Sequence, residues 1–250
     1  MNKLDPSVAI AAMACKSSAA SVPAADPALE KLATVMDGRA KTYGLLARLY
    51  RVEVDQPLLD ELRAMRFPTN TGNAHVDEGY GLMYRFLGRT WEDSVLELAR
   101  DYVRVFIGHG VNGHAAAYPY ESVHTSEKRL LMQEARTEVL ATYRANHLKK
   151  DEHWRECEDH IAVELEFMQV MCVRAAANLR SGDEDGAIEC VRTQRAFVAE
   201  HLANWVPMLS ADMLRFAQTD LYRGLAELTL GFVQTEGGLL DELLSGVDAA

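Results

Sequence analysis

Apolar side chains recur every three or four positions along almost the whole chain from residue 27 onward. That spacing places them on one face of an α-helix, whereas a half-buried strand alternates apolar and polar residues. Runs with the alternation of a strand are nearly absent. The clearest apolar stripe, whose steps of four and three residues predict a helix buried along one side, consists of Ile161, Leu165, Met168, Cys172, Ala175 and Leu179. The pattern predicts an all-α protein.

Turn-forming residues divide this pattern into about eight or nine helices joined by short connections. The expected helices span roughly residues 36–50, 57–67, 76–87, 91–106, 126–146, 161–180, 183–207 and 213–236. Asp183 is expected to cap the helix that follows it, Pro207 to end that helix, and Gly237-Gly238 to end the last one. Because no repeat of fixed length occurs, we predict a compact, bundle-like single domain over residues 28–250, behind a mobile tail of residues 1–27.

Charge and composition narrow the class of partner. The chain of 250 residues is 48% hydrophobic and 25% charged, which is ordinary for a globular protein, and its formal net charge is -11. An acidic surface repels phosphate backbones, so no nucleic-acid partner is expected, while a basic peptide would be attracted. No apolar run approaches the roughly 20 residues of a membrane-spanning helix, so no stable membrane insertion is expected. The four cysteines form no CxxC pair, which favours reduced thiols and a cytoplasmic location.

Catalytic signatures are absent from the sequence. It holds no phosphate-binding GxxxxGK[ST] loop, no GxSxG elbow and no HExxH pair, so we expect neither enzymatic activity nor a bound cofactor. One alternative is a helical metal-binding protein. His153, Cys157 and His160 would share a face if they lay on one continuous helix, and imidazole with thiolate suits zinc.

Carboxylates are concentrated in the same region. Residues 151–166 hold seven of them, namely Asp151, Glu152, Glu156, Glu158, Asp159, Glu164 and Glu166. A solvated helix start explains such a cluster, because carboxylates complement the positive end of the helix dipole. From this composition alone we favour the solvated helix start. The alternative is a binding site for an arginine-bearing peptide, because carboxylate and guanidinium form charge-assisted, bidentate pairs.

Four segments resemble a known family, in the family's order. Residues 156–161 (ECEDHI), followed by Glu164-Leu165 and Phe167-Met168, resemble the hallmark Glu-Pro-x-Asp-His-Ile motif of TorD/DmsD chaperones. Residues 101–108 (DYVRVFIG), 118–123 (YPYESV) and 201–207 (HLANWVP) are similar to three further blocks of that family. Cys157 stands where the family usually has proline, which would pre-set the backbone of a first helical turn, so the presentation of Asp159 and His160 stays open.

The resemblance implies a single all-α domain that works as a cytoplasmic chaperone. Such a chaperone binds the twin-arginine leader and the apo-form of a molybdopterin oxidoreductase, and delays export until the cofactor is inserted. It performs no chemistry itself and is a monomer or a dimer. A further alternative is an adaptor bundle that shares only the ancestry of the fold and has no link to export.

The hypothesis assigns eight residues to leader binding. Asp159 and His160, with Glu156 and Glu158, are expected to bind the basic part of the leader. A facing loop is expected to consist of Tyr118, Tyr120, Glu121 and Ser122. Core packing also accounts for Tyr120, and helix capping for Ser122. Because an unperturbed imidazole titrates near neutrality, His160 would make leader binding depend on pH.

Overall fold

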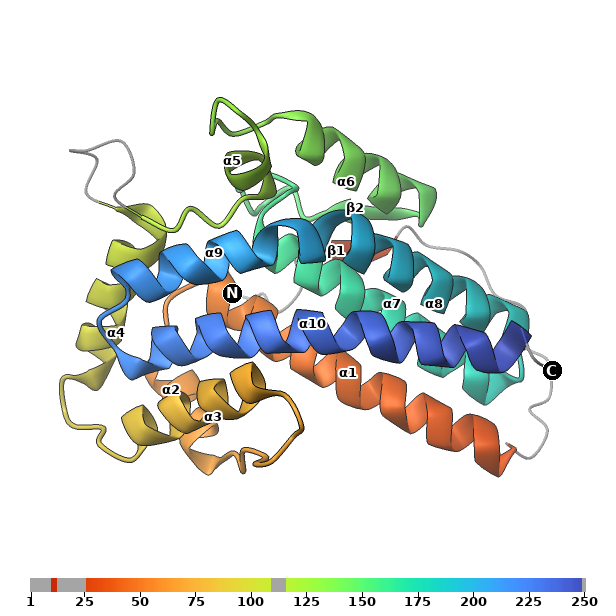
Figure 1. Cartoon of the computed structure of the whole chain (residues 1–250), viewed down its shortest axis with the longest axis horizontal. Coiled ribbons are helices and arrows are strands. Elements are labelled where there is room, and N and C mark those ends of the chain that lie inside the picture. Colours follow the sequence, from red (N-terminus) through yellow and green to blue (C-terminus); the bar gives the residue numbers. More distant parts are fainter. Residues whose placement is uncertain (1–9, 13–25, 109–115, 249–250) are drawn as a thin grey trace, which may run out of the picture.

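The computed structural model describes residues 10–12, 26–108 and 116–248, and the described chain is almost entirely helical (Figure 1). Its α-helices are α1 (Pro27–Arg51), α2 (Gln56–Ala64), α3 (Ala74–Leu87), α4 (Ser94–Tyr102), α5 (Glu121–Thr125), α6 (Glu134–Ala145), α7 (Ile161–Ser181), α8 (Glu184–Phe197), α9 (Ala203–Phe216) and α10 (Asp220–Asp248). Two π-helical segments, Val103–Ile107 and Val198–Leu202, continue α4 and join α8 to α9. The all-α prediction is confirmed, and nine of these helices have nine or more residues.

Helix α7 is the centre of the bundle. It packs between α1 and α8, while α10 runs the length of the molecule and contacts α3, α9 and α8 (Figure 1). Every residue from Ile161 to Met168 is buried, so the first two turns of α7 are covered on all sides. The predicted apolar stripe lies in this core, because Leu165, Cys172 and Ala175 are fully buried.

Local signals fix several helix ends. Asp26 accepts a hydrogen bond from the amide of Ala28 at 2.8 Å, and Pro27 occupies the first turn of α1. Asp183 accepts from the amide of Gly186 at 3.0 Å, which confirms the predicted cap of α8. Gly182 ends α7 in the left-handed conformation, with φ of 77°, that glycine adopts without steric cost.

Two predicted helix ends are wrong. Pro207 lies inside α9, where the burial of Trp205, Val206 and Leu209 offsets the roughly 3 kcal/mol that an internal proline costs. Gly237 and Gly238 lie inside α10. The preceding residue, Glu236, is buried and accepts hydrogen bonds from Arg39 (Nε to Oε1, 3.0 Å) and from the Tyr43 hydroxyl at 2.7 Å, which fastens α10 to α1.

The segment before α6 also differs from its prediction. The helix expected over 126–146 begins only at Glu134, and residues 126–133 form a loop. Its start is set by Ser122, whose hydroxyl accepts a hydrogen bond from the amide of Gln133 at 3.1 Å. A contact between two separate segments therefore decides where α6 begins, which periodicity within the segment does not reveal.

The predicted tail is only partly described. Ile10–Ala12 form strand β1, which pairs antiparallel with strand β2 (Leu148–Lys150), and residues 1–9 and 13–25 lie outside the described residues. The division of the chain at residue 27 stays a prediction. Among the described helices, none has the length and apolar composition needed to cross a membrane.

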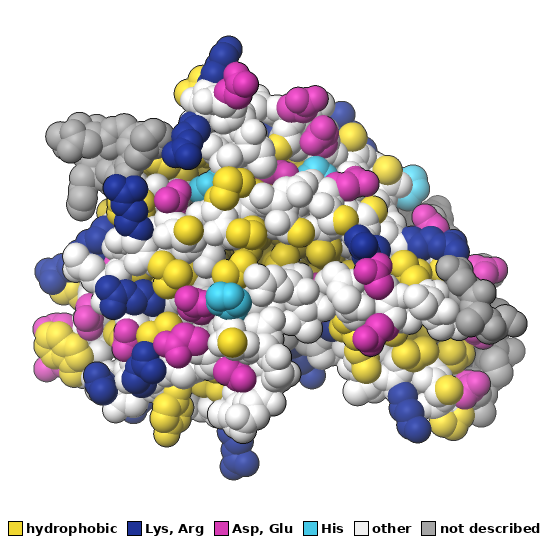
Figure 2. Space-filling model, viewed as in Figure 1, with side chains coloured by type: hydrophobic (Ala, Val, Ile, Leu, Met, Phe, Trp, Pro, Cys, Tyr) yellow, Lys and Arg dark blue, Asp and Glu magenta, His cyan; other side chains and the backbone are white. Residues whose placement is uncertain are grey.

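One face of the molecule carries charges of both signs. Figure 2 shows acidic and basic side chains scattered over the face seen in Figure 1, with hydrophobic atoms gathered across its middle. The acidic net charge is therefore not concentrated on this face.

Helices α3 and α10 approach each other closely where Gly79 and Gly224 meet. A Cβ on Gly79 would lie 2.6 Å from the amide nitrogen of Leu228, and one on Gly224 would lie 2.7 Å from the carbonyl oxygen of Gly79. Both contacts are with backbone, which has little freedom to move aside. Gly81, two residues further along α3, meets only the end of the flexible Arg85 side chain at 4.0 Å.

We expect Gly79→Ala to lower the free energy of unfolding by about 1–3 kcal/mol, because the added methyl group forces α3 and α10 apart. Gly81→Ala is the matched control and should stabilise by up to about 1 kcal/mol, since alanine is the better helix former. Urea denaturation followed by circular dichroism measures both variants. Equal stability of the two would contradict this account of the crossing.

Candidate peptide-binding site

The two segments of the predicted site lie against each other although about 40 residues separate them. Tyr120 and His160 form an antiparallel bridge. The amide of Glu121 donates to the carbonyl of Asp159 at 3.0 Å, and the amide of Ile161 donates to the carbonyl of Pro119 at 2.9 Å. These backbone bonds fix the start of α5 beside the start of α7.

Asp159 is fully buried, and its side chain caps α5, a helix from a different part of the chain. Its Oδ2 accepts a hydrogen bond at 3.0 Å from the amide of Ser122, in the first turn of α5. The residue that precedes α5, Tyr120, makes no side-chain cap, so Asp159 provides the capping interaction from another part of the chain. Among the described residues, no group donates to the buried Asp159 Oδ1.

His160 caps α7. Its Nδ1 accepts a hydrogen bond from the amide of Ala162 at 3.0 Å, and its ring meets the rings of Tyr120 and Trp154 edge to face at 5.0 and 4.9 Å. Burial, assisted by the charge of Arg51, lowers the pKa of His160 to about 3. The imidazole is therefore neutral at mildly acidic and neutral pH, and the pH dependence expected from this residue is not supported.

The spacing argument for a metal site is wrong. Residues 151–160 form turns, and α7 begins only at Ile161, so His153, Cys157 and His160 do not share a helix face. The helix starts there although cysteine replaces the family's proline, because the His160 ring caps it. Within the described parts of the chain, no group of three or more His, Cys, Asp or Glu residues is arranged to hold a metal ion.

Glu121 is buried and holds α5 against the π-helical segment Val198–Leu202. Its Oε2 lies 3.0 Å from Nδ1 of His201, and both side chains are only 4% exposed. Glu164 lies close by and accepts a hydrogen bond from Nε1 of Trp205 at 3.0 Å. Burial, and then the negative charge of Glu121, raise the pKa of Glu164 well above its usual range, which favours the neutral form of this carboxyl group.

The remaining predicted residues reach the surface. Glu156 is exposed and accepts a hydrogen bond from the hydroxyl of the half-buried Tyr120. Glu158 is half-buried and pairs with Arg136 of α6 at 2.6 Å. Tyr118 is half-buried, and its carbonyl lies 2.9 Å from Nε2 of His124. Of the eight predicted residues, four are therefore buried, namely Glu121, Ser122, Asp159 and His160.

A depression beside this site was not predicted. It measures about 480 Å³ and combines two acidic residues with an apolar and aromatic wall; its lining consists of Arg51, Val52, Glu53, Val54, Asp55, Val95, Ala99 and Tyr102. Arg51 stacks over the ring of Trp154 at 5.1 Å. Glu156 follows Trp154 by two residues, so the depression adjoins the segment that bears the exposed carboxylate. Burial, and then the charges of Glu156 and Glu53, raise the pKa of Tyr102.

Only the short acidic run Glu53-Val54-Asp55 between two predicted helices hints at this depression in the sequence. Its relation to Glu156 depends on a contact across about 100 residues, which no local pattern reveals. The depression and Glu156 together form a surface that we call the acidic patch, defined by Glu53, Asp55 and Glu156.

Comparisons with known proteins agree with the motif resemblance. The family model described as nitrate reductase delta subunit matches residues 73–211, more than half of the chain. Chaperone protein TorD of Vibrio cholerae is 26% identical over 223 residues, which cover 86% of this chain and 97% of the relative. Chaperone protein TorD of Vibrio vulnificus strain YJ016 is 26% identical over 85% of this chain and 99% of its own length. Chaperone protein TorD of Photobacterium profundum is 29% identical over 61% of this chain and 68% of its own length.

The matched region contains both segments of the site, from Tyr118 to Ser122 and from Glu156 to His160. The curated relatives are named as chaperones, which is a role without catalysis and agrees with the expectation that the protein is not an enzyme. The chain belongs to the TorD family of chaperones.

Proposed function

We propose that this protein is a cytoplasmic chaperone that binds the twin-arginine leader and the apo-form of a molybdenum-dependent oxidoreductase. It holds this client for cofactor insertion before export. Membership of the TorD family supports a role in the maturation of redox enzymes. The finer assignment rests on the chemistry of the acidic patch.

The observation that carries the proposal is the exposed carboxylate of Glu156, two residues after Trp154, whose ring contacts Arg51 in the lining of the depression that also holds Glu53 and Asp55. A guanidinium group pairs with a carboxylate through two parallel hydrogen bonds, so two neighbouring arginines need carboxylates at two neighbouring positions. The aromatic wall formed by Tyr102 offers a flat surface on which a guanidinium also stacks. The net charge of -11 raises the rate at which a basic peptide meets the protein.

The buried residues support this role by positioning. Asp159 and His160 fix the two helix starts between which Tyr120 lies, and Tyr120 in turn holds the carboxylate of Glu156. A site that is ordered before the ligand arrives loses less conformational entropy on binding. In this proposal, four of the eight predicted residues contribute through the shape of the site, and Glu156, Glu158, Tyr118 and Tyr120 through contact.

A tagged pull-down from the native organism grown anaerobically tests the proposal, with the bound proteins identified by mass spectrometry. We expect a molybdopterin oxidoreductase that retains its twin-arginine leader. Recovery only of proteins without such a leader would contradict the proposal and favour the adaptor bundle that has no link to export.

Glu156→Gln should weaken the binding of a twin-arginine leader peptide about fivefold, the value of about 1 kcal/mol for an exposed ion pair. Glutamine still accepts the hydrogen bond from Tyr120, so the shape of the site is kept while its charge is lost. The affinity of the variant should also fall less steeply with added salt. Fluorescence anisotropy over a salt series measures both effects.

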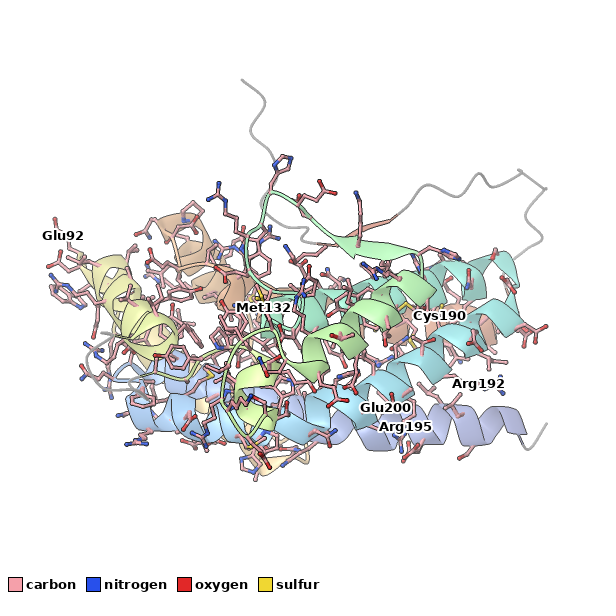
Figure 3. The ribbon with its side chains drawn as sticks, turned by 90° about the horizontal axis from the view of Figure 1, so that it is seen from above. Glu92, Met132, Cys190, Arg192, Arg195 and Glu200 are labelled. Atoms are coloured by element: carbon pink, nitrogen blue, oxygen red, sulfur yellow. The ribbon has the colours of Figure 1, made fainter. Side chains whose placement is uncertain are left out.

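Glu242→Gln is the matched control, because Glu242 is exposed and belongs to the C-terminal part of α10, which lies at the opposite end of the molecule from α4 (Figure 1 and Figure 3). It removes the same charge and should leave the affinity unchanged. Equal losses in the two variants would indicate that net charge acts alone and that the acidic patch is misplaced.

Asp159→Ala should lower stability by about 1 kcal/mol, the usual value of a lost cap, and leave the buried amide of Ser122 without a partner. Leader affinity should fall because α5 is loosened, although Asp159 makes no contact with the peptide. Asp159→Asn keeps an acceptor oxygen and should therefore lose less stability and less leader affinity. Hydrogen exchange at the amide of Ser122, measured beside peptide affinity, separates the two effects.

If Asp159→Asn weakens binding as much as Asp159→Ala while the Ser122 amide stays protected, the carboxylate charge itself contacts the leader. That result would contradict the positioning role.

A further inference from the structure

A small apolar pocket lies at the end of the molecule opposite α4, where the start of α1, the start of α8 and the end of α10 meet (Figure 1). Of the ten described residues that line it, nine are apolar, and the exception is Glu184. Leu32 belongs to the lining and is 38% exposed, and Val35, one turn further along α1, is 43% exposed. Adjoining apolar side chains that are open to water mark a surface that a partner covers.

The size of the pocket suits a single side chain. Its volume is about 100 Å³. Pockets that enclose small-molecule ligands measure about 300–1,000 Å³, so this one is too small for such a ligand. In protein–protein interfaces, much of the binding energy comes from a few large side chains that fill small pockets of the partner. The pocket therefore fits an apolar anchor residue from another protein.

The segments that border the pocket are strongly acidic. Ten carboxylates and three basic side chains, a net charge of -7 out of -11 for the whole chain, occur in residues 26–37, 180–192 and 239–248. Arg180, one of the three basic residues, is already paired with Glu30 at 3.1 Å and with Asp37 at 2.6 Å. This end of the molecule therefore attracts cations.

Carboxylates of α8 lie within one helical turn of the apolar wall. Glu184 and Ile188 both line the pocket, and a separation of four residues places them on the same face of α8. Asp185 precedes Ile188 by three residues and is exposed beside them. A partner that inserts an apolar side chain into the pocket therefore meets negative charge at its edge.

The helix dipoles explain only part of this charge. Glu184 and Asp185 lie in the first turn of α8, where carboxylates complement the dipole. Helix α10 shows the opposite case, because cations are favoured in a last turn and the last turn of α10 contains no basic residue. Asp241 and Glu242 are exposed on the same part of α10. A basic partner would complement both these carboxylates and the end of the helix.

We propose that this pocket docks a basic amphipathic helix of a partner protein. An apolar residue of that helix fills the pocket, and lysine or arginine residues on either side of it face the acidic segments. Residues three and four apart lie on the same face of a helix, so cations one turn before and after the anchor flank it. The insertion of an amphipathic helix into an apolar groove is a common mode of recognition. The pocket is separate from the proposed leader site, whose depression is lined by residues of α4.

The test uses the full-length protein and three fluorescent synthetic peptides of about 18 residues, because shorter helices are marginal in water. The basic peptide has leucine at every third or fourth position and lysine and alanine elsewhere. The acidic peptide replaces each lysine with glutamate, and the third peptide replaces each leucine of the basic one with alanine. We expect the protein to bind the basic peptide, and to bind the other two at least about tenfold more weakly. Fluorescence anisotropy measures the three affinities.

Leu32→Ser removes part of the pocket wall and should weaken binding of the basic peptide about tenfold, as burial of one apolar side chain predicts. Leu96→Ser is the matched control, because Leu96 is 48% exposed and lies on α4, at the other end of the molecule. Glu184→Gln should weaken binding by up to about fivefold, the value of an exposed ion pair, and by less in added salt. Since the three substituted side chains are exposed, circular dichroism should show an unchanged fold.

Glu156→Gln separates this inference from the proposed function, because it should weaken binding of a leader peptide and leave binding of the basic helix unchanged. If Glu156→Gln weakens binding of the basic helix and Leu32→Ser does not, the helix binds at the acidic patch, so the inference fails while the proposed function stands. Equal affinity for the basic and the acidic peptide, or no binding of either, also overturns the inference. If Leu32→Ser changes the oligomeric state in size-exclusion chromatography and leaves peptide affinity unchanged, a second copy of this chain covers the pocket and the inference is wrong.

Discussion

The burial of the first two turns of α7 on every side is the constraint on which the rest of the structure depends. A helix start leaves backbone amides without partners, and a buried start must satisfy them inside the protein. The ring of His160 provides one acceptor, and the two acidic side chains within these turns are buried beside polar partners. Glu164 binds the indole of Trp205, and Glu166 pairs with Arg51 at 3.1 Å. The chain around α7 is arranged to supply these partners.

Capping from a distant part of the chain recurs at the start of α10. Asp101 is buried and accepts hydrogen bonds at 2.7 Å from both the amide and the hydroxyl of Thr219, immediately before α10. Asp159 does the same for α5. Both aspartates belong to the segments that resemble the TorD family. Some residues of the family motifs therefore cap helices. Solvent-facing residues such as Glu156 are sequence neighbours of these capping residues.

The sequence predicts the helical features that depend on nearby residues. It does not predict those that depend on contacts between distant parts of the chain. The stripe of α7 and the cap at Asp183 follow from residues within a few positions of each other, so both were predicted. Pro207 does not end its helix because the burial of neighbouring side chains outweighs the cost of an internal proline. Gly237 does not end α10 because the buried ion pair of the preceding residue, Glu236, holds the helix in place. The motif identified the segments of the site, but not the burial of Asp159. Nothing local connects Glu53 to Glu156, so the acidic patch emerged only from the fold.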